Sequence, residues 1–174
     1  MMKTKSKRLA FLLRHDRTYE FEPSGWREVD DLMTNHGFSY SELESIVASD
    51  SKGRFEFSSG KTSIRARWGH SIPVELGDEC SEVPDTLYHG TADINLLCIQ
   101  KEGIQRKGRQ FVHLTDNRIL AMESGKRHGN PVVLTIDSGK MKEAGIKFWK
   151  RGNCIWLTEK VEIQYISIKK ETGA

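Results

Sequence analysis

The spacing of apolar residues changes near residue 50, and this change restricts the folds that the chain can adopt. Before it, apolar residues recur at the three- and four-residue intervals of amphipathic helices, as Leu9, Leu12 and Leu13 do. After it, residues 54–57 alternate, a Ser-Gly pair follows, and 62–68 continue as a second extended segment. The first part of the chain therefore predicts three helices, over 4–15, through Val29–Met33 and over 40–48, followed by a β-hairpin.

Local signals agree with these helices. Gly37 can end the second helix in the left-handed conformation. Either Ser39 or Ser41 can cap the third helix, whose buried face would carry Leu43 and Ile46. Three short helices before a hairpin is the order of a winged-helix domain, which serves nucleic-acid readers and protein adaptors alike.

A polar, acidic stretch without periodicity runs from residue 73 to 84 and predicts a boundary between domains at 1–76 and 82–174. Beyond it, short strands alternate with helices that we expect to start at Asp93 and Asp116 and to end at Gly103 and Gly125. The expected strands cover 86–89, 111–114, 131–136, 155–157 and 163–166. The whole chain is thus predicted to be an α+β protein with two domains.

Composition excludes several classes of protein. No stretch approaches the roughly 18 apolar residues of a membrane span, and the short apolar run after the basic start does not fit a signal peptide. The cysteines, Cys80, Cys98 and Cys154, form no Cys-x-x-Cys pair, which indicates a reducing, cytoplasmic compartment and argues against zinc. The net charge of +3 does not identify a nucleic-acid binder, but residues 1–17 hold six Lys or Arg against the single acid Asp16.

Histidines and arginines occupy positions suited to binding phosphate. Four of the six histidines lie at strand ends or beside glycine: His70, His89, His113 and His128. Arginine carries a planar fork of donors that matches phosphate oxygens. Taken singly, each histidine also fits a structural role and each arginine a solvated surface charge. No P-loop, dinucleotide-binding or nucleophile-elbow motif is present in the sequence.

Eight short blocks together resemble the NAD-dependent RNA 2′-phosphotransferases, in order from Ser6 to about Ile166. The blocks are Leu12–His15, Gly25–Trp26, Arg54–Phe55, Ile64–Ser71, Leu87–Thr91, Val112–Leu114, Arg127–Leu134 and Trp156–Thr158. The resemblance implies a winged-helix RNA-binding domain over 1–76 and an NAD-binding domain of the ADP-ribosyltransferase fold over 82–174. It also implies an enzyme of tRNA processing or RNA repair that consumes NAD. The cysteines indicate the cytoplasm, and the size of the chain agrees with a monomer. No histidine has a Cys, Asp or second His at metal-ligand spacing, so we expect no metal.

In that family an internal RNA 2′-phosphate attacks C1″ of the nicotinamide ribose and expels nicotinamide. The ribose O2″ then attacks the phosphorus, which releases 2′-hydroxyl RNA and ADP-ribose 1″,2″-cyclic phosphate. The resemblance places the catalytic set on Arg14, His15, Arg54 and Arg109. Because Arg54 and Arg109 lie in different predicted domains, we expect the phosphate to contact both domains.

The resemblance also implies binding residues. A His-His pair, His89 and His113, heads the NAD-binding set, which continues with Gly90, Thr91, Leu114, Thr115, Gly125 and Arg127. RNA binding falls on Arg65, His70 and Ser71.

The sequence departs from the family pattern at several positions. Gln110 stands where His is common, Cys154 stands where Gly is usual, and the segment His15-Asp16-Arg17 lacks the Pro that is often seen after the His. Trp68 replaces a usual Gln and could stack on an RNA base. None of these changes removes a catalytic position, so we expect an active enzyme.

Two alternatives remain at this stage. One is an ADP-ribosyltransferase that stops after the first step and caps terminal nucleic-acid phosphates; it would tolerate the loss of His15 or Arg54. The other is a non-enzymatic winged-helix binder of nucleic acid. Its recognition helix should be basic, whereas residues 39–48 contain Glu42 and Glu44 and no Lys or Arg.

Overall fold

The computed structural model describes residues 2–127 and 129–168, so His128 lies outside the described residues. The chain divides into two compact units. The N-terminal unit comprises 1–77 with 108–110, and the C-terminal unit comprises 78–107 with the chain from 111 onward. Helices and two antiparallel sheets are present in the described residues, which confirms the α+β class.

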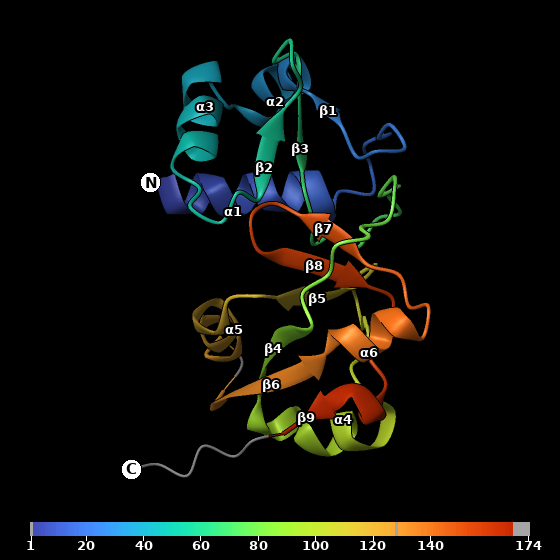
Figure 1. Ribbon diagram of the computed structural model, residues 1–174. Helices are drawn as coiled ribbons and strands as arrows, with labels where there is room; N and C mark the ends of the chain where they lie inside the picture. Colours follow the sequence, from blue (N-terminus) through green and yellow to red (C-terminus); the bar gives the residue numbers. More distant parts are fainter. Residues whose placement is uncertain (1, 128, 169–174) are drawn as a thin grey trace. The chain divides into compact units, whose positions relative to one another are not determined.

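The N-terminal unit contains three helices and a small antiparallel sheet (Figure 1). The helices are α1 (Met2–Arg14), α2 (Val29–His36) and α3 (Tyr40–Ala48). The strands β1 (Arg27–Glu28), β2 (Phe55–Phe57) and β3 (Ser63–Ala66) pair in the order β1-β3-β2. The three predicted helices and the hairpin are confirmed; β1 is too short to have left a periodic signal.

Capping and core packing account for these elements. Gly37 ends α2 with φ 67°, and Ser39 caps α3 in a capping box with Glu42. The apolar stripe of α1 packs with residues of the other helices and of the sheet. The fully buried members of this core are Leu9, Leu13, Leu32, Leu43 and Ile64.

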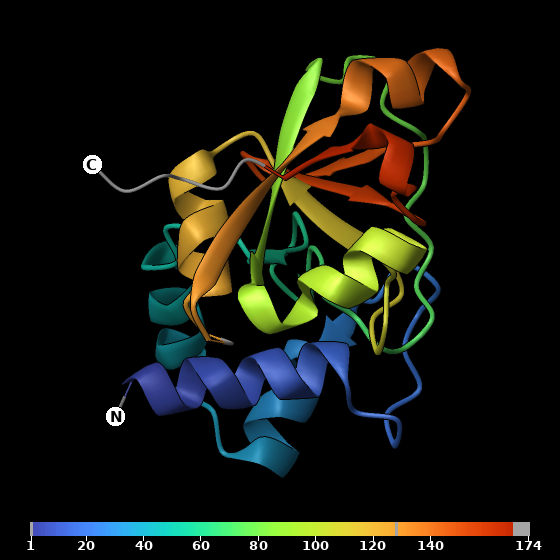
Figure 2. The same ribbon diagram turned by 90° about the horizontal axis from the view of Figure 1, so that it is seen from below.

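The C-terminal unit is built on a six-stranded antiparallel sheet, in the order β7-β8-β5-β4-β6-β9. Its strands are β4 (Thr86–Ala92), β5 (Val112–Thr115), β6 (Pro131–Asp137), β7 (Trp149–Arg151), β8 (Ile155–Thr158) and β9 (Ile166–Ser167). Its helical segments are η1 (Asp93–Asn95), α4 (Leu96–Glu102), α5 (Arg118–Gly125), α6 (Ser138–Glu143) and η2 (Ile163–Tyr165). In Figure 2, α4 and α5 lie on opposite sides of β4.

Three local expectations need correction. Asn117, not Asp116, caps α5, because its side chain accepts hydrogen bonds from the backbone N–H groups of Ile119 and Leu120. The expected strand over 163–166 is mostly the 3₁₀ turn η2, and only Ile166 enters a strand. Trp68 is 7% exposed and belongs to the buried apolar residues, so its ring does not offer a surface on which an RNA base could stack.

Gly90 allows α5 to approach β4 closely. A Cβ atom at this position would lie 1.7 Å from the carbonyl oxygen of Ala121 in α5. Gly125, at the end of the same helix, would place a Cβ 2.5 Å from the carbonyl oxygen of Thr91. In both cases the close contact is between the backbone of β4 and the backbone of α5, so a side chain at either glycine could be accommodated only if the helix moved.

We therefore expect Gly90→Ala to destabilise the C-terminal unit by about 3 kcal/mol or more, the upper range for overpacking. Thermal unfolding followed by circular dichroism measures this effect. Gly60→Ala is the matched control, because its Cβ would meet only Thr62 Oγ1 at 4.0 Å and its φ is not positive. Equal melting temperatures for the two variants would contradict the packing role of Gly90.

Candidate functional site

Arg14 ends α1 with part of its guanidinium group buried and unpaired. Its Nε and Nη2 atoms are inaccessible to solvent and have no hydrogen-bond partner among the described residues. Its Cζ lies 5.8 Å from the ring centroid of Phe55, the first residue of β2. A buried donor without a partner costs free energy, so this part of the site favours an acceptor that the protein itself does not supply.

Arg54 lies over the same aromatic ring. Its Cζ is 5.5 Å from the Phe55 centroid, so the ring supports both guanidinium groups. Asp50 holds Arg54 in two ways: its Oδ1 accepts from Arg54 Nε at 2.9 Å, and its Oδ2 accepts from the Arg54 backbone N–H. Arg54 therefore keeps a fixed position while 36% of its side chain remains exposed.

Arg109 reaches the same region from a distant part of the sequence. Gly108–Gln110 group with the N-terminal unit, so Arg14, His15, Arg54 and Arg109 all belong to one unit, although the sequence suggested two. A Cβ on Gly69 would lie 2.9 Å from Arg109 Nη1 and 3.1 Å from Arg14 Cζ. Gly69 thus allows two guanidinium groups to approach the same stretch of backbone, and its φ of 93° also favours glycine.

Gln110 fixes Arg109 to this unit. Its side-chain Nε2 donates to the carbonyl of Val74 at 2.7 Å, and its Oε1 accepts from the Val74 N–H at 3.1 Å. Its backbone N–H donates to the carbonyl of His70 at 2.9 Å. The glutamine amide provides a donor and an acceptor together. Gln110, which stands where His is common in the family that the sequence resembles, therefore has a structural role here.

Electrostatics in this region favour the binding of an anion. Burial, then the charges of Arg109 and Arg54, lower the pKa of Arg14 to about 10, although Asp50 acts in the opposite direction. Three like charges held together with buried donors unsatisfied are stabilised by an anion with several acceptor oxygens. A phosphate dianion fits this description.

His15 follows Arg14 and is oriented by Ser71. Its Nδ1 lies 2.9 Å from Ser71 Oγ, and the Ser71 N–H donates to the carbonyl of Arg14 at 3.0 Å. Burial, then the charges of Arg14 and Arg109, lower the pKa of His15 below its usual value of 6.5. The imidazole of His15 is therefore mainly neutral at pH 7, and in this form it can accept a proton.

The three expected RNA-binding residues lie in different environments. Ser71 contacts His15, as described above, and His70 is only 5% exposed. Arg65 already has partners: its Nε donates to Glu56 at 2.7 Å, its Nη1 donates to the carbonyl of Ser24, and its Cζ lies 4.3 Å from the Trp26 ring centroid. Arg65 therefore links the β2–β3 hairpin to the segment that contains Ser24 and Trp26.

In the C-terminal unit, the two expected histidines lie on the adjacent strands β4 and β5. His89 Nδ1 donates to the backbone carbonyl of His113 at 2.9 Å, which leaves His89 Nε2 as an acceptor. Burial lowers the pKa of His89, the hydrogen bond to His113 works against this, and the charge of Lys107 adds to it. His89 is therefore neutral at pH 7.

The remaining expected NAD-binding residues lie in the same unit and differ in exposure. Thr91 and Thr115 are buried, and their Oγ1 atoms accept from Asn95 Nδ2 and from the Asn117 N–H. Leu114 packs in the core of the unit. Arg127 is exposed and donates to Ser124 Oγ, while Gly90 and Gly125 make the close approaches to α5 given above.

Two features are absent from the part of the chain that the structure describes. No group of three or more His, Cys, Asp or Glu side chains is placed to hold a metal ion there. No helix in the same residues is long and apolar enough to cross a membrane.

Three contributors to this site had not been singled out from the sequence as site residues. Asp50 anchors Arg54, Phe55 supports two arginines, and Gly69 lies against Arg14 and Arg109. Asp50 four residues before Arg54 was a readable signal, because that spacing lets a carboxylate reach an arginine when the chain turns between them. The closeness of Gly69 to Arg109 depends on tertiary structure.

The position of His15 among these charges predicts its titration. In a ¹H–¹³C NMR titration of the free protein we expect an imidazole pKa below 6.5, and Arg109→Gln should raise it toward 6.5 because one repelling charge is removed. The unfolded chain binds a proton below about pH 6.5 that the folded chain does not, so His15 lowers stability as the pH falls through that range. Arg8→Gln, at an exposed position of α1, should leave the value unchanged; a wild-type pKa at or above 6.5 would contradict the arrangement.

Comparison with known proteins identifies the family. The model of the "RNA 2'-phosphotransferase, Tpt1 / KptA family" matches residues 2–160. A probable RNA 2′-phosphotransferase of Agrobacterium fabrum is 37% identical over 177 residues, which cover 97% of this chain and 95% of the relative. Probable RNA 2′-phosphotransferases of Flavobacterium johnsoniae (38% over 175 residues, 96% of both chains) and Pseudomonas savastanoi pv. phaseolicola (38% over 172 residues, 94% and 92%) are similar to it as well. The chain therefore belongs to the RNA 2′-phosphotransferase family.

Proposed function

We propose that this protein transfers an internal RNA 2′-phosphate to NAD, giving 2′-hydroxyl RNA, nicotinamide and ADP-ribose 1″,2″-cyclic phosphate. The observation that carries the proposal is the group formed by Arg14, Arg54 and Arg109, in which Arg14 has buried donors without partners among the described residues. A 2′-phosphate dianion supplies the acceptors and the charge that this group favours. Each arginine–phosphate charge pair at 4 Å is worth about 4 kcal/mol at an effective dielectric near 20.

In the first step a phosphate oxygen forms a bond to C1″ of the nicotinamide ribose while the bond from C1″ to nicotinamide breaks. The arginines bind and orient the phosphate for this attack. In the second step O2″ forms a bond to phosphorus and the bond to the RNA 2′-oxygen breaks. Negative charge grows on the phosphate oxygens during this step, so the same guanidinium groups stabilise its transition state.

His15 handles a proton in the second step. O2″ must lose a proton to attack, and the departing RNA 2′-oxygen must gain one. A neutral imidazole can accept the first proton and, once protonated, donate to the second oxygen. The hydrogen bond between His15 and Ser71 orients the ring for this role.

We assign NAD to the C-terminal unit, on an ADP-ribosyltransferase-like fold. His89 supports this assignment because its neutral ring is fixed by the His113 carbonyl and presents Nε2 as an acceptor for a ribose hydroxyl. We assign RNA binding to the N-terminal unit as a winged-helix domain, and we expect the enzyme to work in the cytoplasm as a monomer. The proposed chemistry needs no metal.

The function is tested with a short RNA bearing one internal 2′-phosphate, incubated with the protein with and without NAD and resolved by mass spectrometry. The proposal predicts NAD-dependent loss of the phosphate together with ADP-ribose cyclic phosphate. RNA that keeps its phosphate and gains ADP-ribose would instead identify a one-step ADP-ribosyltransferase. RNA that is bound but unchanged would indicate a binding protein.

We expect Arg54→Ala and Arg109→Ala each to lower the turnover rate by about 10²–10³-fold, the usual loss for one group that stabilises transition-state charge. Single-turnover kinetics with the same RNA measure the effect. Arg8→Ala removes one exposed positive charge from α1 and should stay within about threefold of wild type. Unchanged turnover in a folded Arg54 or Arg109 variant would refute the role of that residue.

His15→Ala should let the ADP-ribosylated RNA intermediate accumulate, because the second step loses its proton acceptor and donor while the arginines remain. Quenched time courses analysed by mass detect this species. If only unreacted RNA is found, His15 serves binding or the first step instead.

A further inference from the structure

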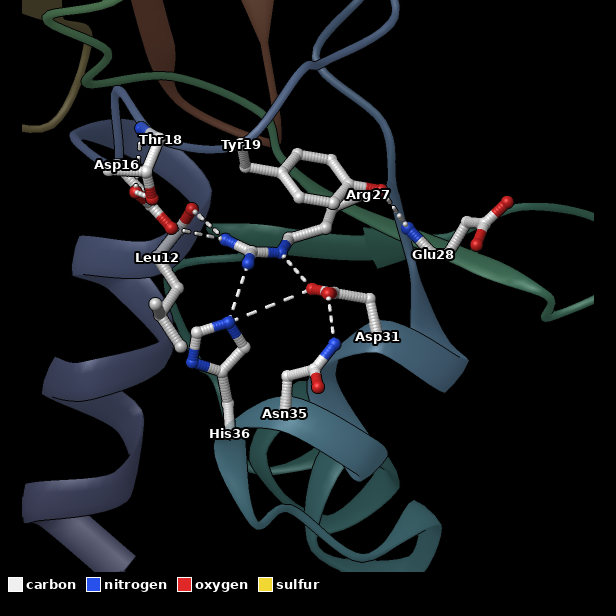
Figure 3. A network of polar contacts seen from close by, with 9 residues as sticks. All are labelled: Leu12, Asp16, Thr18, Tyr19, Arg27, Glu28, Asp31, Asn35 and His36. Carbon is white, nitrogen blue, oxygen red and sulfur yellow. Dashed lines mark hydrogen bonds and ion pairs between the residues drawn. The ribbon is translucent and has the colours of Figure 1, made fainter.

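Arg27 is a buried cation with partners on several sides (Figure 3). It opens the short strand β1, and its side chain is 2% exposed. Its Nε donates to Asp31 Oδ2 at 2.7 Å, and its Nη2 donates to His36 Nε2 at 2.7 Å; both partners are on α2. The ring of Tyr19 covers it, with the centroid 4.1 Å from Cζ.

The remaining nitrogen of Arg27 contacts the chain on both sides of Arg14 and His15. Nη1 donates to the carbonyl of Leu12 at 3.0 Å and to Asp16 Oδ2 at 2.9 Å. The carbonyls of the last turn of a helix have no N–H partner within the helix. Arg27 therefore supplies a partner at the end of α1 and also holds the first residue after His15.

Asp16 is itself held rigidly. Its Oδ1 accepts from the backbone N–H of Thr18 at 3.0 Å and from Thr18 Oγ1 at 2.6 Å. Burial of the carboxyl opposes its ionisation, but the hydrogen bonds from Thr18 and Arg27 together lower the pKa of Asp16 to about 2. The carboxylate is thus ionised throughout the neutral range and remains an acceptor for Arg27.

These contacts set the position of the end of α1 against α2. A buried ion pair adds little net stability, because desolvation offsets the attraction, but removing one partner leaves an uncompensated buried charge. The directions of the hydrogen bonds from the planar guanidinium group restrict where its partners can lie. The His15 ring contacts Ser71 and the ring of Phe11, so the placement of the backbone at 12–16 decides where the imidazole lies relative to Ser71.

We propose that Arg27 is a positioning residue, which acts through the Leu12 carbonyl and Asp16 to place Arg14 and His15 for phosphate binding and proton transfer. This inference rests on the proposed function of those two residues. It extends the functional set to a side chain that touches no reacting atom.

The test compares two similar substitutions around the same cation. Asp16→Asn and Asp31→Asn each remove one carboxylate that accepts from Arg27, but only Asp16 adjoins His15. In Asp16→Asn, the new Nδ2 faces either Arg27 or Thr18, so one of these donors loses its acceptor. We expect Asp16→Asn to lower kcat at least tenfold with the KM for NAD unchanged, and Asp31→Asn to stay within about twofold of wild type.

An NMR titration of His15 provides a readout that needs no activity. In wild type the end of α1 holds the His15 ring close to the charges of Arg14 and Arg109. In Asp16→Asn the end of α1 is no longer held, so the ring should move away from these charges and the pKa of His15 should rise toward 6.5. Loss of the Asp16 charge alone would lower that pKa instead, so the sign separates movement from a direct charge effect. Failure of the proposed function would remove the kcat difference but leave this shift intact.

Ser39→Ala controls for a general loss of stability, because it removes the capping box of α3 elsewhere in the unit. It should lower Tm without changing kcat or the titration of His15. If Asp16→Asn fails to fold, Arg27→Lys serves in its place: a single ammonium cannot reproduce the planar fork, and the same rise in the His15 pKa is expected. Identical His15 titrations in wild type and in the Asp16 or Arg27 variant would overturn the proposal.

Discussion

Three guanidinium groups held close together are the constraint on which the candidate site in the N-terminal unit depends. Burial, then the charges of Arg109 and Arg54, lower the pKa of Arg14. Such a group persists only if surrounding structure holds it. The Phe55 ring, the Asp50 carboxylate and the side-chain-free Gly69 provide that support. The fold therefore carries an electrostatic cost, and the proposed binding of a 2′-phosphate would offset it.

The supports come from segments that are far apart in the sequence. Arg14 and His15 end a helix, Arg54 precedes a strand, and Arg109 is attached through Gln110 to the segment around Val74. Gln110 is held by hydrogen bonds to backbone, and Arg54 by an ion pair with the buried Asp50, and both contacts fix direction as well as distance. The arrangement suits transition-state stabilisation, because donors that are already oriented need not reorganise during the reaction.

Much of the fold and of the candidate site could be predicted from the sequence, but local patterns do not predict contacts between distant segments. Helical spacing in 4–15 and alternation in 54–57 predicted their elements because each period reflects one buried face. The resemblance brought together four residues that the structure places in one unit. Arg27 could not be recognised, since an arginine beside a glutamate in a two-residue strand looks like a solvated charge. The stacking role expected for Trp68 was wrong, and the role of Gln110 could not be predicted. Only tertiary packing decides whether a side chain is buried or forms hydrogen bonds with a distant part of the backbone.

The proposed function depends above all on binding of the 2′-phosphate itself by Arg14, Arg54 and Arg109. Isothermal titration calorimetry without NAD tests it most directly, with a short RNA that carries either a 2′-phosphate or a 2′-hydroxyl at one internal position. We expect at least tenfold tighter binding of the phosphorylated RNA, and loss of this preference in Arg14→Gln. Equal affinity for the two RNAs in the wild-type protein would contradict it.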